Sequence, residues 1–318
     1  MKSSISRIEI KRLFGASDID ISFKERVTVL YGLNGSGKTV TLDILHRICS
    51  GDIKLEGIQF DTLKLTLDDG DSLTIKGDTF AVSYGGLVEE RHMKDAYDFS
   101  GDGDEQGFLA PFLDKLPKAL LANTDLAGIQ QEVLQAFQQI NQQYHTFSAE
   151  LEGSMLLRLI HPYTVYSLED LKRILRGVIS EETRSKKKLG VLREYADTAV
   201  RILSVLNRVF STKTVILSAK DGYQILTQEG WLLPLDKLSS GEQQELVLQH
   251  NLLFKAEQGS YILVDEPERS MHPSWQEAFL PNFFEVAKEK DLHLVVATHS
   301  PYIANDYPEL MVGLHTSI

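Results

Sequence analysis

The sequence has little cysteine and no long apolar run, and both shortages narrow the kinds of protein it can encode. Cys49 is the only cysteine among 318 residues, so neither a disulfide framework nor a cysteine-based zinc site is expected. No apolar run approaches the roughly 20 residues of a membrane helix, and the residues after Met1 lack the apolar core of a secretory signal. We therefore expect a cytoplasmic protein with no membrane partner.

Positive charge is scarce as well. The chain carries 33 basic and 45 acidic residues, a formal net charge of −12, which argues against a surface built as a whole to coat nucleic acid. The one dense basic cluster in the sequence is Arg184-Ser185-Lys186-Lys187-Lys188. Such a run is either a solvated helix face or a local contact to nucleic acid, and both interpretations stay open.

The sequence does contain a complete phosphate-binding motif. Residues 32–39 read Gly-Leu-Asn-Gly-Ser-Gly-Lys-Thr, between an apolar β-type run and a helical run, which is the context that the motif requires. In such a loop the backbone N–H groups hold phosphate oxygens, Lys38 neutralises the β- and γ-phosphates, and the Thr39 hydroxyl ligates Mg²⁺. The residues expected to contact the nucleotide are Asn34, Gly35, Ser36, Gly37, Lys38, Thr39 and Val40.

A pair of acidic residues that could act on the same nucleotide lies far along the chain. The continuous apolar run 261–264 ends in Asp265-Glu266, as expected for a buried parallel strand with acids at its carboxyl end. Asp265 is expected to hold Mg²⁺ and Glu266 to act on the attacking water. Two acids that only cap a strand are the alternative. A further buried strand, over residues 292–297, leads to His299.

Together with these motifs, two further segments make the chain similar to the ABC-type ATPases. The segment Leu238-Ser239-Ser240-Gly241-Glu242 resembles the signature loop of that family, in which Ser239 and Gly241 would meet ATP bound by a second copy. The same segment is also an ordinary helix cap, and the two interpretations are compatible. His299 resembles the switch histidine that senses the γ-phosphate, and residues 270–273 occupy the position of the D-loop.

One branch of that superfamily resembles this chain in more detail. The Asp-Glu-Pro-Glu run from 265, followed by His-Pro-Ser-Trp from 272, is similar to the OLD, RecF and SMC-related ATPases. The resemblance is strongest to the ATPase subunits of bacterial anti-phage systems such as PtuA of Septu. It implies that Arg12 touches the nucleotide phosphate; a surface arginine is the alternative. Only 19 residues follow His299, too few for the nuclease domain of OLD enzymes, so we expect a separate effector protein.

These patterns predict an α/β fold, an ABC-type P-loop ATPase head with a mixed β-sheet and a helical insertion. Residues 1–95 and 211–318 are expected to form the head and residues 108–210 the insertion. Helices are expected over 126–147, 168–179 and 181–210, where apolar residues recur at helical spacing.

The function expected from this resemblance is an ATPase that dimerises around ATP, or assembles further. It would regulate a separate nuclease or toxin in a prokaryotic defence or DNA-transaction complex. A RecF-like repair ATPase that binds DNA and a transporter ATP-binding subunit are the alternatives.

Overall fold

The structure is a computed structural model in which the chain forms two compact units. The first consists of Met1–Ala122 and Ala256–Ile318, and the second of Asn123–Lys255. The residues that the structure describes are 2–92, 109–122, 126–147, 165–185, 190–210, 212–218, 220–271 and 273–314. Residues 186–188 of the basic cluster and His272 of the D-loop segment therefore lie outside the described residues.

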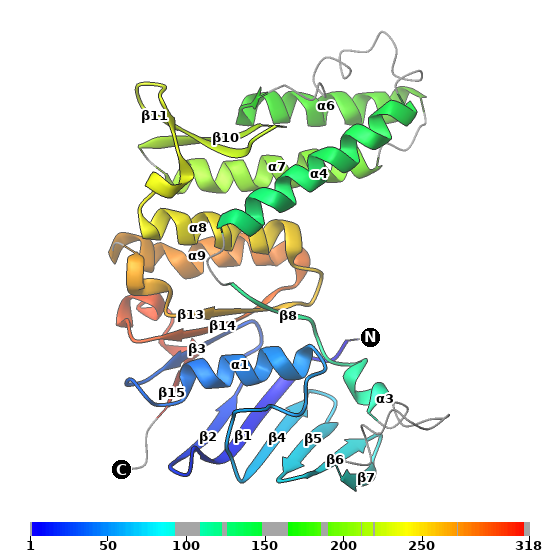
Figure 1. Ribbon diagram of the computed structural model, residues 1–318, viewed down its shortest axis with the longest axis vertical. Helices are drawn as coiled ribbons and strands as arrows, with labels where there is room; N and C mark the ends of the chain where they lie inside the picture. Colours follow the sequence, from blue (N-terminus) through cyan, green and yellow to red (C-terminus); the bar gives the residue numbers. More distant parts are fainter. Residues whose placement is uncertain are drawn as a thin grey trace. The chain divides into compact units, whose positions relative to one another are not determined.

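A parallel sheet in the first unit joins the two ends of the chain (Figure 1). Its strands, in spatial order, are β15 (Met311–Gly313), β3 (Val27–Tyr31), β14 (His293–Thr298), β13 (Tyr261–Asp265) and β8 (Ala119–Leu121). All neighbours run parallel, so the carboxyl ends of β3, β13 and β14 meet at one edge of the sheet. That edge is where parallel α/β sheets hold ligands.

The other sheet of the first unit is antiparallel. Its strands are β2 (Ser17–Ser22), β1 (Ile5–Leu13), β4 (Thr62–Leu67), β5 (Ser72–Lys76), β6 (Thr79–Tyr84) and β7 (Leu87–His92). The apolar residues of β4 alternate, so Leu63, Leu65 and Leu67 are all buried in the core. Strands β4 and β5 form a hairpin and are paired from Leu63–Ile75 to Thr66–Ser72.

Helix α1 (Lys38–Cys49) lies between the two sheets (Figure 1). Leu42, Ile44, Leu45 and Ile48 are at most 1% exposed and belong to the core cluster that also contains residues of both sheets. Full burial of each such side chain contributes about 1.5–3 kcal/mol. This packing fixes the start of α1, and with it the phosphate loop. Helix α9 (Pro273–Lys290) covers the opposite face of the parallel sheet.

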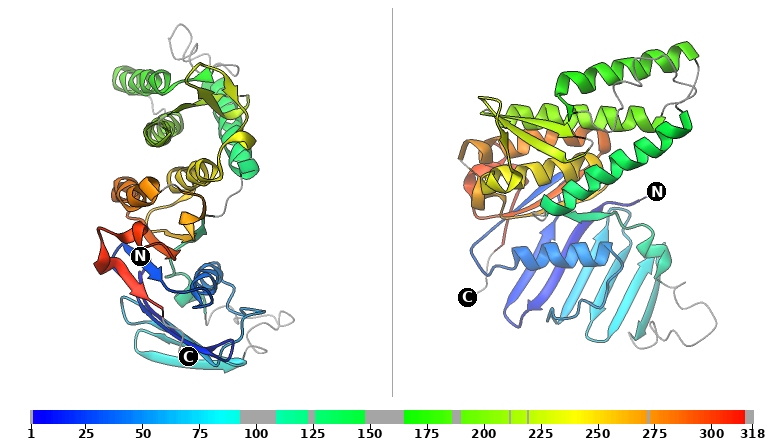
Figure 2. Two further views of the ribbon diagram at one scale, coloured as in Figure 1. Left: turned by 90° about the vertical axis from the view of Figure 1, so that its left-hand side faces the viewer. Right: turned by 45° about the horizontal axis from the view of Figure 1, so that its top comes forward.

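The second unit is mostly helical, as predicted for the middle of the chain. Its helices are α4 (Leu126–Phe147), α6 (Leu168–Ser185), α7 (Gly190–Val209) and α8 (Ser240–His250). Figure 2 shows α6 and α7 running alongside each other. A small antiparallel sheet contains β12 (Leu232–Leu233), β11 (Gly222–Thr227), β10 (Lys213–Ser218) and β9 (Val165–Tyr166).

Two predicted helix boundaries in this unit are wrong. Helix α6 continues past Ile179 to Ser185. Neither Ser180 nor Glu181 is a glycine or proline, the residues that usually end a helix. Glu181, the expected start of the next helix, belongs to α6, and α7 is Gly190–Val209. Helix α8 ends at His250, and Asn251–Lys255 is a π-helical turn. Such wide turns occur mostly as short insertions in α-helices.

The remaining described elements are short. They are α3 (Ala110–Leu113) and the 3₁₀ turns η2 (Leu235–Lys237), η4 (Pro267–Ser270), η5 (Pro301–Ala304) and η6 (Pro308–Leu310). Among the described helices, none combines the length and apolar character needed to cross a membrane. The two structural units divide the chain at other positions than the expected head and insertion, so that functional division stays a prediction.

Candidate functional site

A pocket of about 430 Å³ opens at the carboxyl edge of the parallel sheet. Residues 34–40 of the phosphate loop line it, together with Glu266 from the end of β13 and His299 from the end of β14. Leu13, Phe14, Ala16 and Ser17 form another wall, from the turn between β1 and β2. Residues more than 200 positions apart in the sequence, such as Thr39 and Glu266, therefore line one pocket.

The backbone of the loop is shaped to receive an anion. Gly35 and Gly37 have φ values of 80° and 90°, a conformation that favours glycine. Gly37 begins α1 without any side-chain cap, and the first turn of α1 contains no acidic residue. Within the part of the chain that the structure describes, the buried hydroxyl of Ser36 has no hydrogen-bond partner. Uncapped N–H groups at a helix start, beside a free hydroxyl, are suited to phosphate oxygens.

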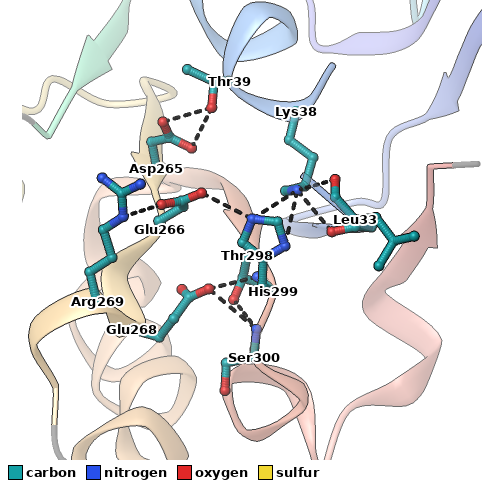
Figure 3. A network of polar contacts seen from close by, with 11 residues as sticks. Leu33, Lys38, Thr39, Asp265, Glu266, Glu268, Arg269, Thr298, His299 and Ser300 are labelled. Atoms are coloured by element: carbon teal, nitrogen blue, oxygen red, sulfur yellow. Dashed lines mark hydrogen bonds and ion pairs between the residues drawn. The ribbon is translucent and has the colours of Figure 1, made fainter. Parts of the chain in front are cut away.

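Lys38 points its ammonium group into the centre of the site (Figure 3). Its Nζ donates to the carbonyl oxygens of Gly32 and Leu33 at 2.8 and 3.0 Å, and lies 3.3 Å from His299 Nε2. Burial lowers the pKa of Lys38, although the nearby carboxylates of Glu266 and Asp265 oppose that shift. A charge held this way in the protein interior acts strongly on a bound phosphate.

Thr39 and Asp265 form a pair of oxygen ligands. The Thr39 hydroxyl donates to Asp265 Oδ2 at 2.9 Å, and burial raises the pKa of Asp265 against the opposing effect of this bond. A hydroxyl and a carboxylate are the hard oxygen donors that Mg²⁺ prefers, and Mg²⁺ is commonly held by one or two carboxylates with substrate phosphates. No group of three or more His, Cys, Asp or Glu residues suited to a metal occurs among the described residues. The site thus fits Mg²⁺ held jointly with a nucleotide.

Glu266 has an unusual backbone and two side-chain partners. Its φ and ψ of 44° and 56° place a non-glycine residue in the left-handed region, at a cost of the order of 1–3 kcal/mol. Its Oε1 lies 3.0 Å from His299 Nε2, and its Oε2 accepts a hydrogen bond from Arg269 Nε. An ammonium only donates, so the consistent assignment is a proton on Nε2 of His299 and a lone pair on Nδ1 toward Lys38.

Three residues around the pocket were missed by the sequence reasoning. Arg269 contacts Glu266, and Glu268 accepts hydrogen bonds from the backbone of His299 and Ser300. Phe14 lines the pocket while remaining 53% exposed. Glu268 and Arg269 follow Glu266 by two and three positions in the sequence, but only the 3₁₀ turn η4 directs their side chains toward the site.

Other predicted site residues lie elsewhere. Arg12 is not among the residues that line the pocket; it forms an ion pair with Asp61 at 3.3 Å. Ser239 and Gly241 lie in the second unit, at the start of α8, where Ser239 forms a capping box with Glu242. The contacts expected of Arg12, Ser239 and Gly241 with a nucleotide stay predictions.

Comparison with known proteins finds similarity to a family model and to several curated proteins. A family model described as "AAA domain, putative AbiEii toxin, Type IV TA system" matches residues 158–305. An OLD nuclease of Thermus scotoductus is 24% identical over 95% of this chain and 60% of that protein. A phosphonates import ATP-binding protein PhnC of Chromohalobacter salexigens is 27% identical over 43% of this chain and 55% of its own length. The chain thus spans less than two thirds of either relative.

Solved structures show the same fold. The Smc head domain of Pyrococcus furiosus with an extended coiled coil, bound to the C-terminal domain of ScpA, has a TM-score of 0.51 at 12% identity, covering 99% of this chain and 94% of that one. A SmcHead bound to the C-winged helix domain of ScpA has a TM-score of 0.50 at 14% identity, covering 98% and 93%. The predicted fold class, an ABC-type ATPase head, is confirmed. The sequence similarities are to an AAA domain model, an OLD nuclease and an ATP-binding protein.

Proposed function

We propose that the chain hydrolyses ATP as an ABC-type head that closes around the nucleotide with a second copy of itself. The observation that carries the proposal is the convergence of Lys38, Glu266 and His299 on one another inside a pocket lined by the phosphate loop. Thr39 and Asp265 add a pair of oxygen ligands at the same place. This set of groups is the one that phosphoryl transfer requires.

The reaction is the transfer of the γ-phosphoryl group to water, which yields ADP and phosphate. The loop N–H groups and Lys38 hold the phosphates, and Glu266 orients the attacking water and takes its proton. His299 lies beside Glu266 and Lys38, where it senses the terminal phosphate. Thr39 and Asp265 would hold Mg²⁺, which when bound neutralises charge on the phosphate oxygens.

The second copy is proposed to supply Ser239 and Gly241. Ser239 and Ser240 are exposed at the start of α8, so a partner can reach this end of the helix. A helix N-terminus offers N–H groups and partial positive charge to a phosphate. ATP then acts as a ligand shared between two chains, and its hydrolysis releases them.

The separate effector is proposed to be a nuclease or a toxin. The similarity to an OLD nuclease over 95% of this chain, and the toxin named by the matching family model, support this choice. The solved Smc heads bound to parts of ScpA support the docking of another protein on such a head. An anti-phage ATPase subunit of the PtuA kind is the specific form of the proposal, and a RecF-like DNA-binding ATPase stays the alternative.

A transporter subunit is a second candidate because several relatives are phosphonate import ATP-binding proteins. Those similarities cover 43 to 52% of this chain, whereas the similarity to the OLD nuclease covers 95%. Affinity purification from the native host separates the two functions. A nuclease or toxin chain bound to the protein supports the first, and a membrane permease bound to it supports the second.

The test of the chemistry is the Glu266→Gln variant. Removing the proton acceptor is expected to lower the rate of ATP hydrolysis about 10²- to 10⁴-fold while ATP binding is retained. The trapped nucleotide should then shift the variant from monomer to dimer in size-exclusion chromatography with light scattering. Lys38→Ala should bind no ATP, and Glu257→Gln, an exposed glutamate of the same unit, should hydrolyse ATP normally. Unchanged hydrolysis in Glu266→Gln would contradict the proposal.

A further inference from the structure

His299 is held in place by a carboxylate that contacts its backbone and not its ring. Glu268 Oε1 accepts hydrogen bonds from the N–H of His299 at 2.6 Å and from the N–H of Ser300 at 3.2 Å (Figure 3). Both N–H groups lie just beyond the end of β14, where the strand pairing has stopped. The carboxylate therefore takes over from the sheet as the acceptor for this part of the chain.

The two N–H groups differ in how strongly they depend on Glu268. The N–H of Ser300 also donates to Thr298 Oγ1 at 2.9 Å, and the hydroxyl of Ser300 donates to Gln276 of α9. Among the described residues, the N–H of His299 has Glu268 alone as its acceptor. Loss of the carboxylate would thus release His299 while Ser300 keeps its other contacts.

The position of the His299 ring matters because the ring lies between two reacting groups. Its Nε2 is 3.0 Å from Glu266 Oε1 and 3.3 Å from Lys38 Nζ. Glu268 belongs to the 3₁₀ turn η4, and Glu266 is the residue directly before that turn, so one short segment carries the proton acceptor and supports the histidine. A displacement of about 1 Å in such an arrangement costs up to roughly 10²-fold in rate.

We propose that Glu268 is a positioning residue, which sets His299 against Glu266 and Lys38 for ATP hydrolysis. The proposal rests on the proposed function, and Glu268 acts through the backbone of His299 rather than on the substrate. An oxygen acceptor at this position is the property that matters. Glutamine keeps that oxygen at nearly the same place, and alanine removes it.

The first test compares three single variants in the full chain. Glu268→Ala is expected to lower kcat for ATP about 10- to 100-fold with little change in ATP affinity, and Glu268→Gln to restore most of the rate. Glu257→Ala removes an exposed glutamate of the same unit and should leave kcat unchanged. Equal kcat for Glu268→Ala and the wild type would overturn the proposal, and so would an equal loss in the glutamine variant.

The second test asks whether Glu268 acts through His299. In a His299→Ala background, Glu268→Ala should lower kcat less than twofold further, because the group that it positions is already absent. Additive losses in the double variant would show a general structural role and would overturn the proposal.

A third measurement needs no ATP. Hydrogen exchange at the amide of His299 in the nucleotide-free protein should quicken at least tenfold in Glu268→Ala, and that of Ser300 should quicken less. Unchanged exchange at His299 would overturn the proposal even if the chain hydrolysed no ATP. Absence of hydrolysis in the wild type with faster exchange in the variant would contradict the proposed function and leave the positioning contact supported.

Discussion

At the scale of single residues, Gly37 is a position in the phosphate loop where a side chain would collide with its neighbours. A Cβ atom at Gly37 would lie 2.7 Å from Ile19 Cδ1 and 3.2 Å from Leu13 Cδ2. Gly35 has a similar backbone, with φ of 80° against 90°, but a Cβ there would meet nothing within 4 Å. Comparing substitutions at Gly35 and Gly37 therefore separates the loss of stability caused by backbone strain from the loss caused by steric crowding.

Alanine substitutions at these two positions should differ in stability. Gly35→Ala is expected to lower the free energy of unfolding by about 1–2 kcal/mol through its left-handed backbone. Gly37→Ala should add a crowding cost of about 1–3 kcal/mol to a strain of similar size. Urea unfolding of the nucleotide-free protein measures both, without any contribution from bound phosphate. Equal losses in the two variants would show that Ile19 and Leu13 move aside freely.

At the scale of elements, the starts of α1 and α8 are built in opposite ways. Helix α1 begins without a side-chain cap. The start of α8 is capped by a carboxylate of the same helix, because Glu242 Oε2 accepts a hydrogen bond from the N–H of Ser239 at 2.9 Å. Lys213 pairs with the other oxygen of Glu242. The start of α8 is thus stable by itself, and a phosphate from a partner would have to share its donors with Glu242.

The carboxylate of Glu242 makes the stability of the second unit depend on pH. Burial opposes ionisation, but the bonds from Lys213 and Ser239 outweigh it, so the pKa of Glu242 is lowered from its ordinary value of 4.5. A lowered pKa in the folded state gives stability that is present above the ordinary pKa and is lost as the pH falls through the folded value.

This pH dependence can be tested by comparing the stability of the wild type with that of the Glu242→Gln variant. Their difference in free energy of unfolding should be constant above about pH 5.5 and should shrink steadily below the ordinary glutamate value. Chemical denaturation at pH values from 7 to 3 measures it. A difference that does not change over this range would show that folding does not shift the pKa of Glu242. Glu257→Gln, at an exposed glutamate, serves as the control.

The elements that the sequence predicts well are those with a repeated pattern. The helical spacing of α4 and the alternation in β4 and β5 are visible in the residues themselves. Strands β8, β9 and β15 are only two or three residues long, so they contain no pattern, and their pairing partners define them. Whether such short segments form strands depends on their tertiary packing alone.

The residues of the candidate site also differ in how well the sequence predicts them. The phosphate loop and the Asp265-Glu266 pair are contiguous motifs at the ends of apolar runs, so the sequence could indicate them. The contacts of Glu268 and Arg269 depend on the left-handed backbone of Glu266, which turns the chain into η4. No spacing rule predicts that conformation in a residue other than glycine.

At the scale of the whole molecule, the proposed dimer makes each site from two chains. One variant, Lys38→Ala, lacks the phosphate-loop lysine, and another, Gly241→Glu, blocks the start of α8 with a side chain and a negative charge. Each is expected to be inactive alone. Mixed together, they should recover ATP hydrolysis, because a heterodimer contains one site with both Lys38 and Gly241 intact. No activity in any mixture would mean that the two segments do not act across two chains.

The order of strands in the parallel sheet also decides when the site can exist during synthesis. Strand β3 pairs with β14 on one side and with β15 on the other. The sheet around β3 therefore cannot be completed until residues 293–313 have been synthesised. At a translation rate of about 5–20 residues per second, that wait lasts on the order of tens of seconds. A ribosome-bound chain carries the phosphate loop long before it carries Glu266 or His299. A nascent chain therefore has no complete site until His299 has been synthesised.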